Sequence, residues 1–175
     1  MKNFDFYKLI ENRRSIRNYD PKKKIDKTVI KRIVEAGRMA PTSNNNQPAK
    51  IIVVTGDEFL QKIRPSYKRE WFQKAPTILI ITGRKKYAWT RPYDGFNSLE
   101  IDLSIMMDHM ILAAEYEGVS TCWIIAFDKN IIKKALNLDQ EETVLCMTPL
   151  GYPEEGWIKP KMPFRKSLDE LVEYY

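Results

Sequence analysis

The segment from Leu99 to Glu117 constrains the fold of this chain more than any other stretch. It predicts the longest helix, and Gly118 is a fitting end for it. A helix that is apolar on most of its sides must be covered on most of them. In a chain of 175 residues a partner subunit can supply part of that cover; a central core helix in a monomer is the alternative. The apolar side chains nearly encircle the helix: Leu99, Ile101, Leu103, Ile105, Met106, Met107, Met110, Ile111, Leu112, Ala113 and Ala114.

Hydrophobic periodicity and turn residues divide the rest of the chain into strands and helices. We expect strands at residues 50–55, 77–82, 121–126 and 143–147. We expect further helices at 4–12, from the N-cap Asp26 to Pro41, at 57–63, at 128–136, and from the capping box Ser167–Glu170 onward. Residues 64–74 read as a loop or irregular helix, 85–97 as a long loop and 148–153 as a turn-rich exit. No repeat, low-complexity tract or internal boundary is visible, so residues 1–175 are expected to form one domain.

The net charge of +6 raises the question of nucleic acid binding. The 29 basic residues are spread along the chain among 23 acidic ones, so clustered basic patches are not visible. A site for anionic cofactors or substrates explains the surplus equally well. A nucleic-acid-binding domain is therefore kept only as a remote alternative, and we expect no nucleic acid partner.

Several common sites are excluded by composition. The single histidine, His109, rules out a multi-histidine metal centre, and we expect no metal. No glycine-rich dinucleotide or P-loop motif occurs. Cys122 and Cys146 lie in apolar surroundings and read as reduced core thiols. Without an apolar leader, or an apolar run of the ~20 residues that cross a bilayer, we expect a cytoplasmic protein with no membrane contact.

A basic cluster, Arg13-Arg14-Ser15-Ile16-Arg17, follows the first predicted helix. In an extended chain, side chains two residues apart share a face, so Arg13, Ser15 and Arg17 are expected to point the same way. Two guanidiniums beside a hydroxyl suit a phosphate monoester, because guanidinium forks match phosphate oxygens. The plain alternative is a solvated basic stretch at the end of a helix.

A second cluster, from Pro41 to Pro48, consists of hydroxyl and amide side chains between two prolines. Such side chains can donate and accept hydrogen bonds without carrying charge, which suits a flat heteroaromatic ring with polar edges. The plain alternative is an ordinary loop that ends a helix, since serine, asparagine and proline are common turn residues. Together, a phosphate site and an uncharged ring loop indicate a nucleotide-like cofactor.

The order and spacing of these motifs resemble the FMN-dependent nitroreductase family. The resemblance runs nearly end to end and rests on the two clusters, Asp102 in the long helix, and the segments 118–124 and 149–153, followed by Arg165. It implies an α+β fold, a central mixed or antiparallel sheet flanked by helices, and an intertwined homodimer with FMN at the subunit interface. That arrangement would also supply the missing cover of the long helix.

The resemblance also implies roles for individual residues. Arg13, Ser15 and Arg17 of one subunit would hold the FMN phosphate and ribityl chain, and Arg14 and Arg165 would approach the same cofactor. The partner's loop would line the ring through Pro41, Thr42, Ser43 and Asn45, with Gln47 supporting the loop. Trp123 and Ile124, and also Pro149, Leu150 and Gly151, would lie along the flavin. The backbone N–H of Gly151 is our candidate donor to flavin N5.

Three positions depart from the family's pattern. Ile125-Ala126 replaces a frequent Gly-Ala and could crowd the ring. Ala49 replaces a bulky aromatic residue, and Thr42 adds a methyl group to the usual serine. These departures concern substrate access more than cofactor binding.

The activity that the resemblance implies is an FMN-dependent NAD(P)H oxidoreductase. NADH or NADPH would reduce the flavin, and nitroaromatics, quinones or similar small-molecule acceptors would be reduced in a second, ping-pong step. No catalytic side chain is assigned, because the chemistry takes place on the flavin. The alternatives are a flavoenzyme of the same fold with other chemistry (a dehalogenase, an enone reductase or a flavin destructase) and a non-catalytic FMN-binding protein.

Overall fold

A computed structural model describes residues 5–175. Its centre is a four-stranded antiparallel sheet in the order β1-β2-β4-β3. Strand β2 pairs with β1 and β4 at its two edges and is buried along its whole length, since core clusters pack on both of its faces. The strands are β1 (Ala49–Val54), β2 (Thr77–Gly83), β3 (Ser120–Thr121) and β4 (Thr143–Gly151).

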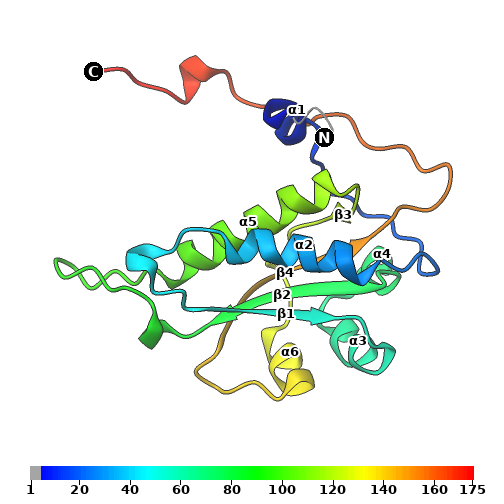
Figure 1. Cartoon of the computed structure of the whole chain (residues 1–175), viewed down its shortest axis with the longest axis horizontal. Helices are drawn as coiled ribbons and strands as arrows, with labels where there is room; N and C mark the ends of the chain where they lie inside the picture. Colours follow the sequence, from blue (N-terminus) through cyan, green and yellow to red (C-terminus); the bar gives the residue numbers. More distant parts are fainter. Residues whose placement is uncertain (1–4) are drawn as a thin grey trace.

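Helices cover both faces of this sheet (Figure 1). On one face lie α2 (Lys27–Arg38) and α5 (Leu99–Tyr116), and on the other lie α3 (Asp57–Ile63) and α6 (Lys129–Leu136). The short α4 (Glu70–Gln73) precedes β2. Helix α1 (Phe6–Asn12) stands on the outer side of α5, away from the sheet. The predicted α+β class with a helix-flanked sheet is confirmed.

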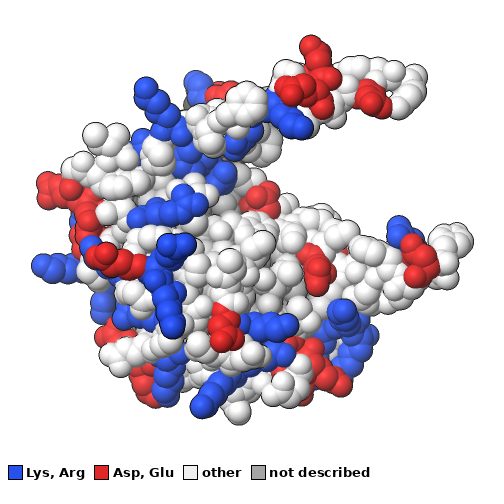
Figure 2. Space-filling view, turned by 180° about the vertical axis from the view of Figure 1, so that it is seen from behind, with Lys and Arg blue, Asp and Glu red and all other residues white. Residues whose placement is uncertain are grey.

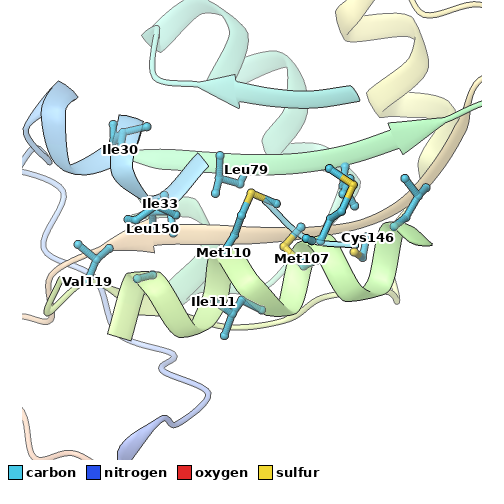
Figure 3. Packing of buried hydrophobic residues seen from close by; sticks show 14 of the residues in the cluster. Ile30, Ile33, Leu79, Met107, Met110, Ile111, Val119, Cys146 and Leu150 are labelled. Atoms are coloured by element: carbon cyan, nitrogen blue, oxygen red, sulfur yellow. The ribbon is translucent and has the colours of Figure 1, made fainter. Parts of the chain in front are cut away.

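The core has two halves, one on each side of the sheet. The larger half packs α2 and α5 against the sheet, with Ile33, Leu79 and Met110 among its fully buried members (Figure 3). A Cβ atom on Gly37 would lie 2.6 Å from Met110 Cγ, so the two helices approach closely there. The second half packs α3 and α6 around residues such as Phe72 and Ile80. The sheet is therefore buried on both faces.

Helix α5 is covered on one broad side only. Leu103, Met107 and Met110 are buried, whereas Ile101 is 49% exposed. Next to α1 and α2, its surface forms an apolar groove lined by Phe6, Leu9, Ala36, Met39, His109, Leu112, Ala113 and Tyr116. The chain by itself thus supplies part of the cover that the sequence demands.

The predicted helix starts at Asp26 and Asp128 are confirmed. The carboxylate of Asp26 accepts a hydrogen bond from Thr28 N at 2.6 Å, and that of Asp128 accepts one from Asn130 N at 2.9 Å. The helix expected over residues 4–12 begins at Phe6, and residue 4 lies outside the described residues. Residues 64–74 form a 3₁₀ turn and α4, in keeping with an irregular helix.

Two expectations at the far edge of the sheet are wrong. The strand predicted over residues 121–126 is only β3, followed by a single bridge from Ile124 to Met147. Its ladder breaks because Cys122 N donates to the side-chain hydroxyl of Thr148, at 3.1 Å, instead of to a backbone carbonyl. Residues 148–153 were predicted as a turn-rich segment after the last strand. Instead β4 continues to Gly151, since Leu150 and Gly151 pair with β3.

The predicted last helix is also wrong. Its capping box is present, with Ser167 and Glu170 bonded to each other, but it opens only a 3₁₀ turn, Leu168–Glu170. A short helix gains most of its stability from packing an apolar face. Leu168 and Leu171 are 74% and 64% exposed, so this turn has no such packing within one chain. Residues 153–175 instead form an extended C-terminal arm (Figure 1).

Candidate functional site

The basic cluster forms an extended segment beside β3. Ile16 N donates to Thr121 O at 2.8 Å, and Ser15 makes a parallel bridge to Thr121. Ile16 is 2% exposed and points into the core, so its neighbours in the alternation face the other way. The extended conformation predicted for this cluster is therefore confirmed.

The cluster's polar side chains share the face opposite Ile16. Because Ile16 points into the core and the segment is extended, alternation places Arg13, Ser15 and Arg17 together on the other side, as predicted. Burial raises the pKa of the nearby Cys122 thiol, and the charge of Arg17 lowers it. Two guanidiniums and a hydroxyl on one face fit a phosphate monoester.

Arg14 has a different environment from its neighbours. Its Nη1 donates to the carbonyl oxygens of Glu11 and Arg13, at the end of α1. A cation at this position satisfies helix carbonyls and opposes the negative end of the helix dipole. Within one described chain, Arg14 thus serves the end of α1.

The segment after the cluster is locked into the body of the protein. Tyr19 is fully buried, and its hydroxyl donates to Ile16 O at 2.9 Å. Asn18 exchanges two hydrogen bonds with Glu154, at 2.8 and 2.7 Å. These contacts fix the backbone that carries Arg13 and Arg17, so the face that these side chains share is preorganised.

The polar loop after α2 has a strained but well-bonded backbone. Asn44, Asn45 and Gln47 adopt positive φ angles of 54°, 55° and 49°. Gln47 N donates to Thr42 Oγ1 at 3.0 Å, and Gln47 Nε2 donates to Asn45 O at 3.3 Å. The predicted support of the loop by Gln47 therefore has a structural basis. Residues 44–47 are exposed to solvent.

One buried carboxylate anchors this loop. Asp102 is 1% exposed, and its Oδ1 accepts hydrogen bonds from Ser43 N at 2.8 Å and Ser43 Oγ at 3.0 Å. Its Oδ2 accepts one from Ser98 Oγ at 2.8 Å. A buried charge requires such partners. Asp102 was part of the sequence motif, but its anchoring role was missed; the clue was a carboxylate on the buried side of an apolar helix.

The two clusters lie at opposite ends of α5. Asp102, in the first turn, holds the polar loop, while the far end of the helix leads into β3 and the basic cluster. The helix between Asp102 and Tyr116 alone is about 21 Å long. Within one chain the polar loop and the basic cluster are therefore well separated.

The remaining predicted contacts lie on or beside β4. Pro149, Leu150 and Gly151 are buried, and a Cβ on Gly151 would lie 2.8 Å from the ring of Tyr19. Ile124 is 4% exposed. Trp123 is half-buried, and residues 125 and 126, which follow Ile124, are exposed. Any flavin contact from 149–151 would therefore come from backbone.

Ile125 was noted in the sequence as a position that could crowd a ring. Ile125 is 70% exposed in the described chain. Arg165 lies on the exposed C-terminal arm, where its Nη1 donates to Phe164 O at 3.0 Å. The described chain alone does not bring Arg165 into hydrogen-bonding contact with the basic cluster.

Residues 5–175 contain no group of three or more histidine, cysteine, aspartate or glutamate side chains placed to hold a metal ion. None of the helices among them has the length and apolar character needed to span a bilayer.

Comparison with known proteins identifies the family. The model of the family described as "Nitroreductase family" matches residues 10–74 and 59–152. A nitroreductase family protein from Clostridium difficile 630 has a solved structure that is 31% identical, covers 98% of each chain and superimposes with a TM-score of 0.87. The chain belongs to the nitroreductase family. The family recognised from the sequence is thus confirmed.

Other relatives show the range of this family. A protein of Archaeoglobus fulgidus with the name of an NADH dehydrogenase/NAD(P)H nitroreductase is 27% identical over 153 residues, covering 85% of each chain. A nitroreductase from Desulfovibrio desulfuricans, solved in complex with FMN, has the same fold, with 21% identity, a TM-score of 0.79 and 99% and 98% coverage. Iodotyrosine deiodinase 1 of Sus scrofa is 23% identical over 205 residues, covering 96% of this chain and 68% of the relative.

Proposed function

We propose that this nitroreductase family member is an FMN-dependent NAD(P)H oxidoreductase that reduces nitroaromatic, quinone or similar small acceptors. The observation that carries the proposal is the extended backbone of residues 13–17 beside β3, which buries Ile16 and leaves Arg13, Ser15 and Arg17 on the opposite face. When bound there, FMN would supply the hydride chemistry, taking hydride from NADH or NADPH and passing it to an acceptor. The chain's own residues bind and orient that group.

The proposed residue roles follow the two clusters. Arg13 and Arg17 neutralise the phosphate, and Ser15 donates to it or to the ribityl chain. The loop of Thr42, Ser43 and Asn45 presents uncharged donors and acceptors to the ring edges. The segments at 123–124 and 149–151 lie along the flavin, with Gly151 N as candidate donor to N5. Arg14 and Arg165 approach the phosphate once the dimer forms.

A homodimer is part of the proposal, because one chain holds its two clusters at opposite ends of α5. Two further features support it. The C-terminal arm is tied to the body by the Lys159–Glu115 pair at 2.5 Å, and beyond it Phe164 and Tyr174 are 84% and 91% exposed. The apolar groove along α1, α2 and α5 is open to solvent. A partner subunit buries such surfaces and completes each flavin site.

The absorption spectrum of the purified protein tests the cofactor directly. We expect flavin bands, FMN in the fraction released by denaturation, and bleaching of the bands by NADH or NADPH without oxygen. A protein that is colourless and takes up no added FMN would contradict the proposal.

Reductive dehalogenation is the second candidate activity, because iodotyrosine deiodinase 1 is among the relatives. Dithionite-reduced holoprotein distinguishes the two activities. Reoxidation by a nitroaromatic or a quinone, with no iodide released from iodotyrosine, is expected. Iodide release without nitroaromatic reduction would favour the second candidate.

A further inference from the structure

A short hairpin, residues 89–98, projects from the body of the protein next to α5. It is the green loop at the far left of Figure 1, and it stands out at the right in Figure 2. All of its side chains from Thr90 to Phe96 are exposed. The sequence predicts this stretch as part of the long loop 85–97, and such loops are a usual place for substrate contacts.

Hydrogen bonds make the hairpin rigid despite its exposure. Ser98 N donates to Trp89 O at 2.9 Å, and Arg91 N donates to Phe96 O at 2.8 Å. Asn97 Nδ2 ties the two sides together by donating to Thr90 Oγ1 at 2.9 Å. Near the tip, Arg91 forms a bidentate ion pair with Asp94, with hydrogen bonds of 2.8 and 2.7 Å. The Arg91 guanidinium also lies 4.9 Å from the centre of the Phe96 ring.

The base of the hairpin shares its anchor with the polar loop. Ser98 Oγ donates to Oδ2 of Asp102, and Ser43 donates to Oδ1 of the same carboxylate. One side chain therefore fixes the hairpin relative to the loop that is proposed to line the flavin ring. Tyr93 lies five residues from Ser98, so it stands at most about 16 Å beyond this anchor.

The hairpin and the turn before it concentrate aromatic side chains. Tyr87, Tyr93 and Phe96 are 56%, 93% and 41% exposed. Arg91 covers one face of the Phe96 ring, and the Lys86 ammonium, 5.4 Å from the ring centre, covers one face of Tyr87. Among residues 5–175 no cation or ring covers Tyr93, which is 93% exposed and presents an open ring near the tip of the hairpin.

We propose that Tyr93 is the side chain on which an aromatic acceptor stacks when it enters the flavin site. The proposal rests on the function proposed above, because the site is defined by the loop that shares Asp102 with the hairpin. The subunit that lends residues 41–48 to a flavin also lends Tyr93 to the acceptor bound there. The substrate class that this residue selects is a planar aromatic, such as a quinone or nitroarene.

Binding and reaction are measured on the FMN-loaded protein and on Tyr93→Ala, Tyr93→Phe and Phe59→Ala. Phe59 is a matched control, since it is 45% exposed on α3, on the other face of the sheet. Benzoate, which is not reduced, is titrated into the oxidised protein by calorimetry. Dithionite-reduced protein is then mixed with benzoquinone or with ferricyanide, which is not aromatic, and reoxidation is followed by stopped flow.

We expect Tyr93→Ala to weaken benzoate binding about three- to tenfold and to raise the half-saturating quinone concentration by a similar factor. Ferricyanide reoxidation should be unchanged, Tyr93→Phe should stay within about twofold of the parent, and Phe59→Ala should match it. Unchanged benzoate and quinone responses in Tyr93→Ala would overturn the proposal, as would an equal loss with ferricyanide. If NADH and NADPH both fail to reduce bound FMN, the proposed function is contradicted instead. The role of Tyr93 is still tested in that case, because the benzoate and dithionite experiments do not use NADH or NADPH.

Discussion

Replacing Asp102 by alanine should destabilise the protein and loosen the polar loop. The side chain is 1% exposed and accepts three hydrogen bonds, two from Ser43 and one from Ser98. Hydrogen bonds to a charged group are worth about 1.5–3 kcal/mol each, but the buried carboxylate also has a desolvation cost that alanine removes. We therefore expect a net loss of about 3 kcal/mol in the free energy of unfolding.

The Asp102→Asn variant separates hydrogen bonding from charge. An asparagine of similar size can still accept both bonds from Ser43 and can donate to Ser98 Oγ. Its expected cost is about 1 kcal/mol. At this chain length 1 kcal/mol shifts Tm by about 2–4 °C, so Asp102→Ala should lower Tm by about 6–12 °C and Asp102→Asn by about 2–4 °C.

Urea unfolding followed by circular dichroism measures these differences. Asp108→Ala is the control, since Asp108 is an exposed carboxylate on the same helix. A double-mutant cycle with Ser98→Ala should give a positive coupling energy, because the two residues share a bond. A loss under about 1 kcal/mol for Asp102→Ala, or no coupling to Ser98, would refute the reasoning.

Three further predictions concern other parts of the fold. Burial raises the pKa of Glu142, but hydrogen bonds from Thr82 and Arg84 at 2.6 and 2.9 Å outweigh burial and hold that pKa below its ordinary value. The stability it contributes is present above the ordinary glutamate pKa and is lost as the pH falls through the lowered one, so Glu142→Gln should be less stable at pH 7 and should approach the parent on acidification in urea titrations. Gly83→Ala should cost about 1–3 kcal/mol, because its Cβ would lie 2.6 Å from Pro48 O, while Gly56→Ala, with open space around it, should be nearly neutral by Tm. Burial raises the pKa of Cys146 to about 12, so native protein at pH 8 should not react there with Ellman's reagent, and rapid labelling would contradict its burial.

Local hydrogen bonds made parts of the fold predictable from sequence. The helix starts at Asp26 and Asp128 depend on a side chain and an amide two residues later, so they need no tertiary information. The strands β1 and β2 were predictable because β-branched runs pack well in a buried sheet. The end of β3 at Thr121 was not predictable, because the hydroxyl that accepts a hydrogen bond from Cys122 N belongs to Thr148, far along the chain.

The site was predictable in the same uneven way. Alternation in an extended chain correctly placed Arg13, Ser15 and Arg17 on one face. No local rule shows that this face meets Cys122, or that Asp102 joins the polar loop to the hairpin, since both contacts bring distant segments together. The last predicted helix failed for a related reason, because the C-terminal arm has no packing surface within its own chain.

The central claim is that each flavin site combines the basic cluster of one subunit with the polar loop of the other. It is tested most directly by the FMN content of mixed dimers. One subunit carries Arg13→Ala and Arg17→Ala, the other carries Thr42→Ala, Ser43→Ala and Asn45→Ala, and each homodimer is first shown to retain little FMN. If the sites are shared, a mixed dimer has one site with both defects and one intact site, and it should bind one FMN. If each chain formed its own site, both sites would be defective, and a mixed dimer without FMN would contradict the account.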